Sequence, residues 1–197
     1  MSRHLRRWSG LAAMLGGVLW ATWAVLVAGK PEGCVGAACD LPGRSPRGYS
    51  DLVPLLGVAV LLIGVGVIGM VMRARSRGHF GQLGRWGLGI SVTGGVLLVT
   101  STLVQGLFFA GDFPLMPVFV IPGVLALAIG FLCFAIAILR VIPRWAGIPL
   151  MVGALALLGV NDQNARILFA VPFGVGWIVV GWVLWTDQTQ HPARSTK

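Results

Sequence analysis

Two cysteines in the segment KPEGCVGAACD, Cys34 and Cys39, are the residues whose type and spacing most directly suggest chemistry. Thiols this close can form a disulfide across a short Gly- and Ala-rich turn, provided that the segment faces an oxidising compartment. Four residues separate them, whereas thiol–disulfide enzymes normally carry their redox pair two residues apart. We therefore expect a structural disulfide, and a thiol–disulfide membrane enzyme is the minor alternative.

A second group of polar residues interrupts an otherwise apolar stretch at residues 86–110: Thr100, Ser101, Thr102 and Gln105. Ser101 and Gln105 are four residues apart and would share one face of a helix. Such a stripe could line a path for a neutral solute. Alternatively, the hydroxyls bond back to their own helix while the amide joins two helices, and we favour this second interpretation.

Two short polar turns, GDFP and NDQNAR, contain a third group: Asp112, Asn161, Asp162 and Arg166. If the turns meet above a helical bundle, these side chains could form a small site for a polar ligand or a partner loop. The simpler interpretation is that they cap helix ends, which leave backbone groups without partners.

Basic residues are concentrated in RARSRGHFGQLGR, which contributes Arg73, Arg75, Arg77 and Arg85. Each basic residue near an anionic membrane surface contributes about 1 kcal/mol of attraction, so we expect contacts with lipid headgroups. No fold motif or aromatic stacking pattern accompanies these charges, and we therefore expect no nucleic-acid partner.

The long apolar runs contain no Asp, Glu, Lys, Arg or His away from their ends, and the three histidines lie outside them. Proton relays need buried carboxylates, and intramembrane metal or haem sites need His or acidic ligands. The sequence therefore predicts a protein that is not an enzyme and that has no cofactor and no metal site.

The amino-acid composition indicates that the elements carrying these residues lie in a membrane. Hydrophobic residues make up 56% of the 197 residues, charged residues only 11%, and the mean hydropathy is +0.87. This excludes a water-soluble globular domain and a disordered chain.

A helix needs about 20 apolar residues to cross the bilayer. Six runs meet this requirement, at residues 8–28, 52–72, 86–110, 118–139, 145–160 and 167–185. We predict one integral membrane domain over residues 1–197, an all-α bundle of six transmembrane helices.

The charges orient this bundle. With the N-terminus inside, 11 of the 15 Lys and Arg residues fall on the cytoplasmic side, and only Lys30, Arg44, Arg47 and Arg166 lie outside. Cytoplasmic segments carry the excess of basic residues in membrane proteins. We therefore expect both termini in the cytoplasm. A cleaved signal peptide at residues 8–28 is the alternative, although this run exceeds the usual apolar core of a signal.

Three of the six runs begin with Arg-Trp, at residues 7–8, 85–86 and 144–145. Their continuations, RWSGLAAMLGGVL, RWGLGISVTGGVL and RWAGIPLMVGALA, align without gaps. This pattern predicts three tandem helical hairpins produced by internal repetition. Interfacial Arg and Trp, and closely packed glycines, are common in membrane helices and offer an alternative explanation.

The segments RWSGLAAMLGGVLW and RVIPRWAGIPLMVGAL, within six spans, resemble a broad group of small uncharacterised bacterial integral membrane proteins of the domain-of-unknown-function type. The resemblance implies a multi-pass protein of the bacterial inner (plasma) membrane and transfers no catalytic residue. We expect a non-enzymatic accessory or scaffolding component that packs against lipid, partner helices or a second copy of itself. The alternative is a facilitator or binding protein for a neutral or lipophilic small molecule.

Overall fold

The computed structural model describes residues 3–34, 39, 43, 45, 47–48, 50–78, 80–108 and 115–186. The regular elements within these residues are all helical. The six long helices are α1 (Arg3–Ala28), α2 (Val53–Ser76), α3 (Gln82–Phe108), α4 (Met116–Ile138), α5 (Arg144–Ala156) and α6 (Val171–Thr186). Three short 3-10 helices join them: η2 (Ser50–Leu52), η3 (Leu157–Gly159) and η4 (Ala165–Ala170).

Five of the helical segments are long and apolar enough to cross a membrane. They are Arg7–Ala28, Val53–Ser76, Gln82–Ser101, Val118–Ile138 and Ala165–Thr186. The remaining segment, Arg144–Gly159, is apolar but shorter. At 1.5 Å per residue it extends about 24 Å, less than the roughly 30 Å of a hydrocarbon core. The architecture is thus that of a helical membrane protein with five full-length helices, and the sixth crossing stays a prediction.

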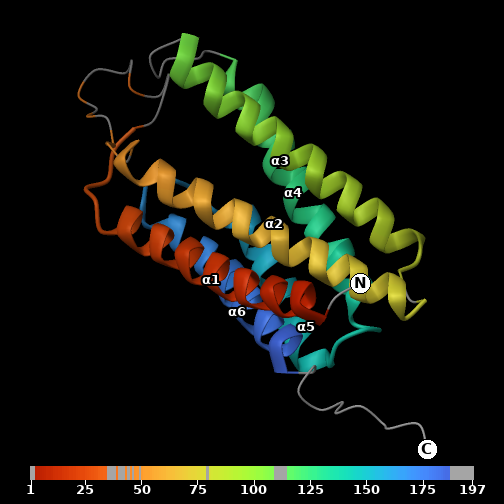
Figure 1. The fold of residues 1–197 in the computed structure, drawn as a ribbon. Coiled ribbons are helices and arrows are strands. Elements are labelled where there is room, and N and C mark those ends of the chain that lie inside the picture. Colours follow the sequence, from red (N-terminus) through yellow and green to blue (C-terminus); the bar gives the residue numbers. More distant parts are fainter. Residues whose placement is uncertain are drawn as a thin grey trace, which may run out of the picture.

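The helices pack in an order that differs from their order along the chain (Figure 1). α1 lies between α2 and α6, α6 also packs on α5, and α5 packs on α4, which pairs closely with α3. α2 and α3 follow one another in sequence but belong to opposite edges of this series. Each helix of the series therefore buries one or two sides and presents the rest outward, where many large apolar side chains are exposed.

Small residues allow the paired helices to approach closely. A Cβ atom on Gly181 of α6 would lie 2.6 Å from the carbonyl oxygen of Gly10 in α1, and one on Gly94 of α3 would lie 2.6 Å from that of Gly123 in α4. Both distances are too short for any side chain, so these contacts require glycine. Glycines at these positions thus serve packing within the bundle.

Aromatic rings fill the centre of the bundle. Trp177 is fully buried, and its ring lies 5.8 Å from that of Phe131 and 6.3 Å from that of Phe173, both in edge-on geometry. Trp20 packs against Phe173 at 5.2 Å and donates its indole N–H to the carbonyl of Ala170 at 3.0 Å. The deep tryptophans Trp20 and Trp177 therefore act as core residues, because other aromatic rings occupy the space beside them.

The loop between α2 and α3, which contains part of the basic segment, is shorter than the sequence predicts. α2 continues to Ser76 instead of ending at residue 72, and α3 begins at Gln82 instead of residue 86. Arg73 and Arg75 therefore belong to the last turn of α2. Helical hydrogen bonding does not stop where apolar residues do, because Arg is a good helix former and its long side chain can reach the interface.

Candidate functional site

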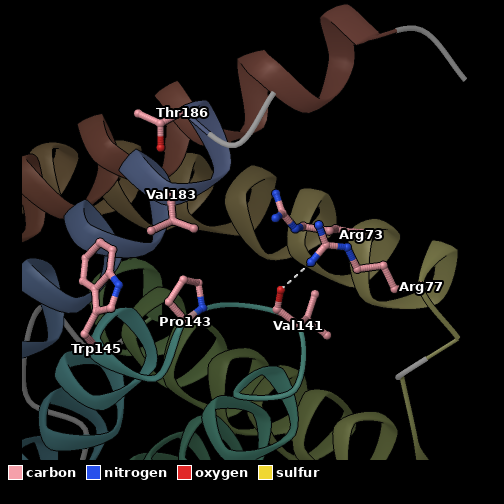
Figure 2. A pocket seen from close by; sticks show the side chains of 7 residues that line it. All are labelled: Arg73, Arg77, Val141, Pro143, Trp145, Val183 and Thr186. Atoms are coloured by element: carbon pink, nitrogen blue, oxygen red, sulfur yellow. Dashed lines mark hydrogen bonds between the residues drawn. The ribbon is translucent and has the colours of Figure 1, made fainter. Parts of the chain in front are cut away.

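A hollow lies where α2 and α6 end and α5 begins (Figure 2). We call it the arginine pocket, and its volume is about 420 Å³. Its walls are Arg73 from α2, Arg77 directly after α2, Val141 and Pro143 from the α4–α5 connection, Trp145 from α5, and Val183 and Thr186 from α6. We call this end of the bundle the pocket end.

Two guanidinium groups dominate the chemistry of the pocket. Arg73 is 7% exposed, which is unusual for an arginine, and Arg77 follows one helical turn later on the same side of α2. The Nη1 atom of Arg77 donates to the carbonyl of Val141 at 2.7 Å, which ties α2 to the α4–α5 connection (Figure 2). Among the described lining residues, Arg73 and Arg77 are the charged ones.

The four arginines that we expected at lipid headgroups are not equivalent. Arg73 and Arg77 line the pocket, whereas the guanidinium of Arg75 lies over the ring of Phe80, 5.6 Å from its centroid. Arg85, in the first turn of α3, is exposed. The structure therefore divides one run of basic residues into two pocket arginines and two arginines outside the pocket.

A second buried arginine lies at the opposite end of the bundle, which we call the disulfide end. Arg47 is 5% exposed, and its guanidinium donates to four backbone carbonyls. Two belong to the end of α1, Val27 and Lys30, and two belong to the turn before η4, Asp162 at 2.8 Å and Asn164 at 3.1 Å. Arg47 thus joins the end of α1 to the α5–α6 connection and satisfies carbonyls that a helix end leaves open.

The cysteine pair holds the segment that carries Arg47. Cys34 and Cys39 form a disulfide with 5.0 Å between their Cα atoms. The backbone of Cys34 forms two hydrogen bonds with later residues: its N–H donates to the carbonyl of Ser45, and its carbonyl accepts from the N–H of Arg47 at 2.8 Å. Nearby, Lys30 and Asp51 form an ion pair of 2.6 Å, and this hydrogen bond lowers the pKa of the Asp51 carboxyl.

The predicted polar stripe on α3 bonds within its own helix as far as it is described. The hydroxyl of Ser101 is 2% exposed and donates to the carbonyl of Leu98 at 2.9 Å, and Ser91 donates to Gly87 at the same distance. Thr100 is exposed. The side chains of Thr102 and Gln105 lie outside the described part of the chain, so the solute path stays a hypothesis.

The predicted outer polar group separates into local turn contacts. The Asn161 side-chain oxygen accepts from the N–H of Gln163 at 2.9 Å, and the carbonyl of Asp162 accepts from Arg47. Arg166 is exposed, and Asp112 lies outside the described residues. Asn161 and Asp162 therefore help to form the turn that receives Arg47.

Sequence reasoning missed Arg47 as an individual residue. A signal was present, because Arg47 is one of four basic residues on the side predicted to carry few of them. It also missed that Val141 would accept a hydrogen bond from Arg77, and that Thr186 would line the same pocket as Arg73 and Arg77. Within the described residues no three His, Cys, Asp or Glu side chains gather as metal ligands.

Comparison of the chain with protein-family models, curated proteins and solved structures finds no match. The resemblance to small six-span bacterial membrane proteins therefore stays a prediction.

Proposed function

We propose that the chain is a non-enzymatic, multi-pass component of the bacterial inner membrane that acts as an accessory or scaffolding subunit. The observation that carries this proposal is how side chains fill the interior of the bundle. The buried polar groups Ser91 and Ser101 bond to their own helix, and aromatic rings fill the centre of the bundle. Hydroxyl groups that bond within their own helix, beside a core of packed rings, support a packing role over a polar path to a substrate.

The proposal includes six crossings arranged as three tandem hairpins. Equivalent positions of the three Arg-Trp segments support this repetition. Gly16, Gly94 and Gly153 align, and each faces the helix that follows its own: Ile63 of α2, Gly123 of α4 and Phe173 of α6. The aligned residues Ala13, Ser91 and Leu150 likewise meet glycines of the following helices, namely Gly66, Gly130 and Gly176. Equal roles at equal spacing favour a common origin over a chance alignment.

The orientation with both termini in the cytoplasm is also part of the proposal. The pocket end holds the start of α1 and the end of α6, because the guanidinium of Arg7 lies 4.2 Å from the centroid of the Trp185 ring. The same end contains the arginines of α2 and of the α4–α5 connection. The disulfide end would then face the oxidising side.

Outward-facing surfaces offer a place for partner helices. On α2, a Cβ atom added to Gly57 or Gly64 meets nothing within 4 Å, and these glycines are flanked by the exposed side chains of Leu61, Val65 and Ile68. Small residues seven apart on an apolar face suit close helix packing against another chain. Lipid would cover the same face in a subunit that acts alone.

The test is native mass spectrometry of the full chain, extracted gently from its host membrane. We expect a reproducible complex with a second membrane protein or a second copy. The substitution Gly64→Leu should dissociate that complex without lowering the Tm, whereas Leu61→Val, on the same face, should leave it intact. A monomer that is unaffected by Gly64→Leu would contradict the partner role.

The facilitator alternative is tested separately in proteoliposomes. We expect the chain to leave the osmotic swelling rate in glycerol or urea at the value of protein-free liposomes. Swelling that is faster with the chain, and that the double substitution Thr102→Val and Gln105→Leu abolishes, would favour the facilitator and overturn the proposal.

A further inference from the structure

We propose that α2 of one chain packs against α3 of a second copy of the same chain. The inference rests on the three-hairpin repeat of the proposed function and deepens that function by naming the partner and the two surfaces. Within one chain, the second helix of a hairpin packs on the first helix of another hairpin twice, as α4 on α5 and as α6 on α1. The third combination of this kind is α2 on α3, and these two helices lie at opposite edges of the series.

The three hairpins can be compared position by position. The first helices align through their Arg-Trp segments, which places Gly10 and Gly17 of α1 opposite Leu88 and Gly95 of α3 and opposite Gly147 and Ala154 of α5. The second helices align through the glycines that meet their own first helices, namely Gly66, Gly130 and Gly176.

The two contacts that are formed between hairpins use equivalent positions. A Cβ atom on Gly10 would lie 2.9 Å from the backbone nitrogen of Trp185 in α6. A Cβ atom on Gly147 would overlap the side chain of Leu139, which corresponds to Trp185 in the alignment of the second helices. The chain itself therefore shows which face of a second helix fits which face of a first helix.

The corresponding face of α2 is open in the half toward the disulfide end. Gly174 of α6, whose Cβ would lie 3.1 Å from that of Ala21 in α1, corresponds to Gly64 of α2. Among the described residues, a Cβ atom on Gly64 meets nothing within 4 Å. One turn later Ile68 is 58% exposed, whereas its counterpart Ile178 is partly buried beside α1.

The corresponding face of α3 is open as well. Gly95 is the equivalent of Gly17, whose Cβ would lie 2.9 Å from the backbone of α6. In the described part of the chain, the nearest atom to a Cβ on Gly95 belongs to Leu127 of the same hairpin, at 3.9 Å. Val92 and Val99, about one turn to either side, are both more than half exposed. α3 thus keeps the glycine of a close helix contact, which destabilises a helix that has no such neighbour.

A second copy is the partner that fits these faces. The open face of α2 corresponds to the faces of α4 and α6 that pack on a first helix. The open face of α3 corresponds to the faces of α1 and α5 that pack on a second helix, so each open face is the complement of the other. Copies that share one orientation in the membrane place α2 antiparallel to the partner's α3, as α6 is to α1. Because the contact joins two different faces, a ring of two or more copies satisfies all of them.

The experiment is disulfide cross-linking of full chains in the membrane. Gly64 and Val99 are the expected neighbours, because their counterparts Gly174 and Ala21 would have Cβ atoms 3.1 Å apart, close enough for a disulfide. Gly64→Cys and Val99→Cys are introduced into two co-expressed chains with different affinity tags, and Cys133→Ala removes the free thiol from both. After oxidation with copper phenanthroline, we expect a product that carries both tags.

The matched control is Val65→Cys combined with Val99→Cys. Val65 is exposed and adjacent to Gly64, but its side chain points about 100° further around α2. Because a disulfide forms only over a narrow range of Cα distances, we expect about fivefold less product from the control pair.

A second measurement needs no cysteine. Gly95→Leu has room within its own chain, so the Tm should not fall, but the new side chain would overlap the partner's α2. Energy transfer between labelled copies in liposomes should show self-association that is weaker by about tenfold, as expected for an overpacked contact. Gly89→Leu is the control, because its Cβ also meets nothing within 4 Å among the described residues but lies on another face of α3. It should change self-association by less than about twofold.

Several results would overturn the inference. A cross-linked product from Gly64→Cys alone would mean that α2 meets α2. A bond that forms only when both cysteines are in one chain would mean that the bundle closes on itself. A yield no higher than that of the Val65→Cys control, or equal effects of Gly95→Leu and Gly89→Leu, would mean that lipid covers both faces.

These results are distinguishable from a failure of the proposed function. A chain that forms a complex with a different membrane protein, but gives no cross-link between copies, would retain the accessory role and lose the contact between α2 and α3. A chain that cross-links to its own copies but binds no other membrane protein would retain the contact and limit the scaffolding role to self-assembly.

Discussion

The two ends of the bundle each bury an arginine but use it differently. Arg47 at the disulfide end donates to four backbone carbonyls, whereas Arg73 at the pocket end lies beside a hollow with a second arginine. Their exposed fractions are nearly equal, 5% and 7%. Burial alone therefore does not indicate the role of an arginine. The groups around it do, because Arg47 is surrounded by backbone acceptors from two connections, whereas Arg73 shares the wall of a hollow with Arg77.

The largest effect should follow the loss of Arg47. The substitution Arg47→Met leaves four backbone carbonyls at this end without their donor, and we expect a loss of about 3–5 kcal/mol in the free energy of unfolding. Arg47→Lys should recover only part of it, because a single ammonium cannot reach both pairs of carbonyls. Thermal unfolding in detergent measures the change, with Arg166→Met as the control for an exposed arginine nearby. If Arg47→Met lowers the Tm no more than Arg166→Met does, Arg47 does not stabilise this end of the bundle.

The disulfide should come next. Replacing both Cys34 and Cys39 by Ser opens a very short loop, and the chain-entropy estimate for a loop of this size is about 2 kcal/mol. In a double-mutant cycle this loss should be smaller in the Arg47→Met background, because the loop then has less to position. Fully additive losses would show that the disulfide and Arg47 act independently. Loss of a thiol–disulfide exchange activity in the double Ser variant would instead favour the enzyme alternative.

At the pocket end, the corresponding effect should be smaller. Arg77→Gln loses one hydrogen bond to Val141, and we expect a cost of about 1 kcal/mol in the free energy of unfolding. Thermal unfolding in detergent measures the change, with Arg75→Gln as the control for an arginine whose side chain lies over Phe80 instead. A loss as large as that of Arg47→Met would remove the contrast between the two ends.

The smallest effect concerns the exposed ion pair between Lys30 and Asp51. The pKa of Asp51 is lowered in the folded chain, mainly by the hydrogen bond from Lys30. Its contribution to stability is therefore present above the pKa of the unfolded chain and is lost as the pH falls through the lower folded value. Because the carboxyl is exposed, Asp51→Asn should hardly change the Tm at pH 7. A shift as large as that of the double Ser variant would contradict this.

Much of the fold could be predicted from local sequence. The helices of α1, α2, α3, α4 and α6 follow from apolar runs of membrane length, since composition alone decides that they cannot remain in water. Their ends were predicted less well. α2 extends beyond its apolar run and includes Arg73 and Arg75 in its last turn. The apolar segment that contains α5 is shorter than the other five, so its length alone does not define a membrane crossing. Hydropathy marks the apolar part of a helix, whereas backbone hydrogen bonding decides where the helix ends.

The sequence by itself determined the class of protein, the cysteine pair as a candidate disulfide and the run of basic residues. It could not tell apart Arg73 and Arg77, which line the pocket, from Arg75, which does not, because their charge and their neighbours along the chain are alike. Only the tertiary structure decided that Arg47 meets carbonyls from turns more than a hundred residues away in sequence. The physical reason is that burial and hydrogen-bond partners depend on which helix ends come together in space, and the local sequence carries no record of that.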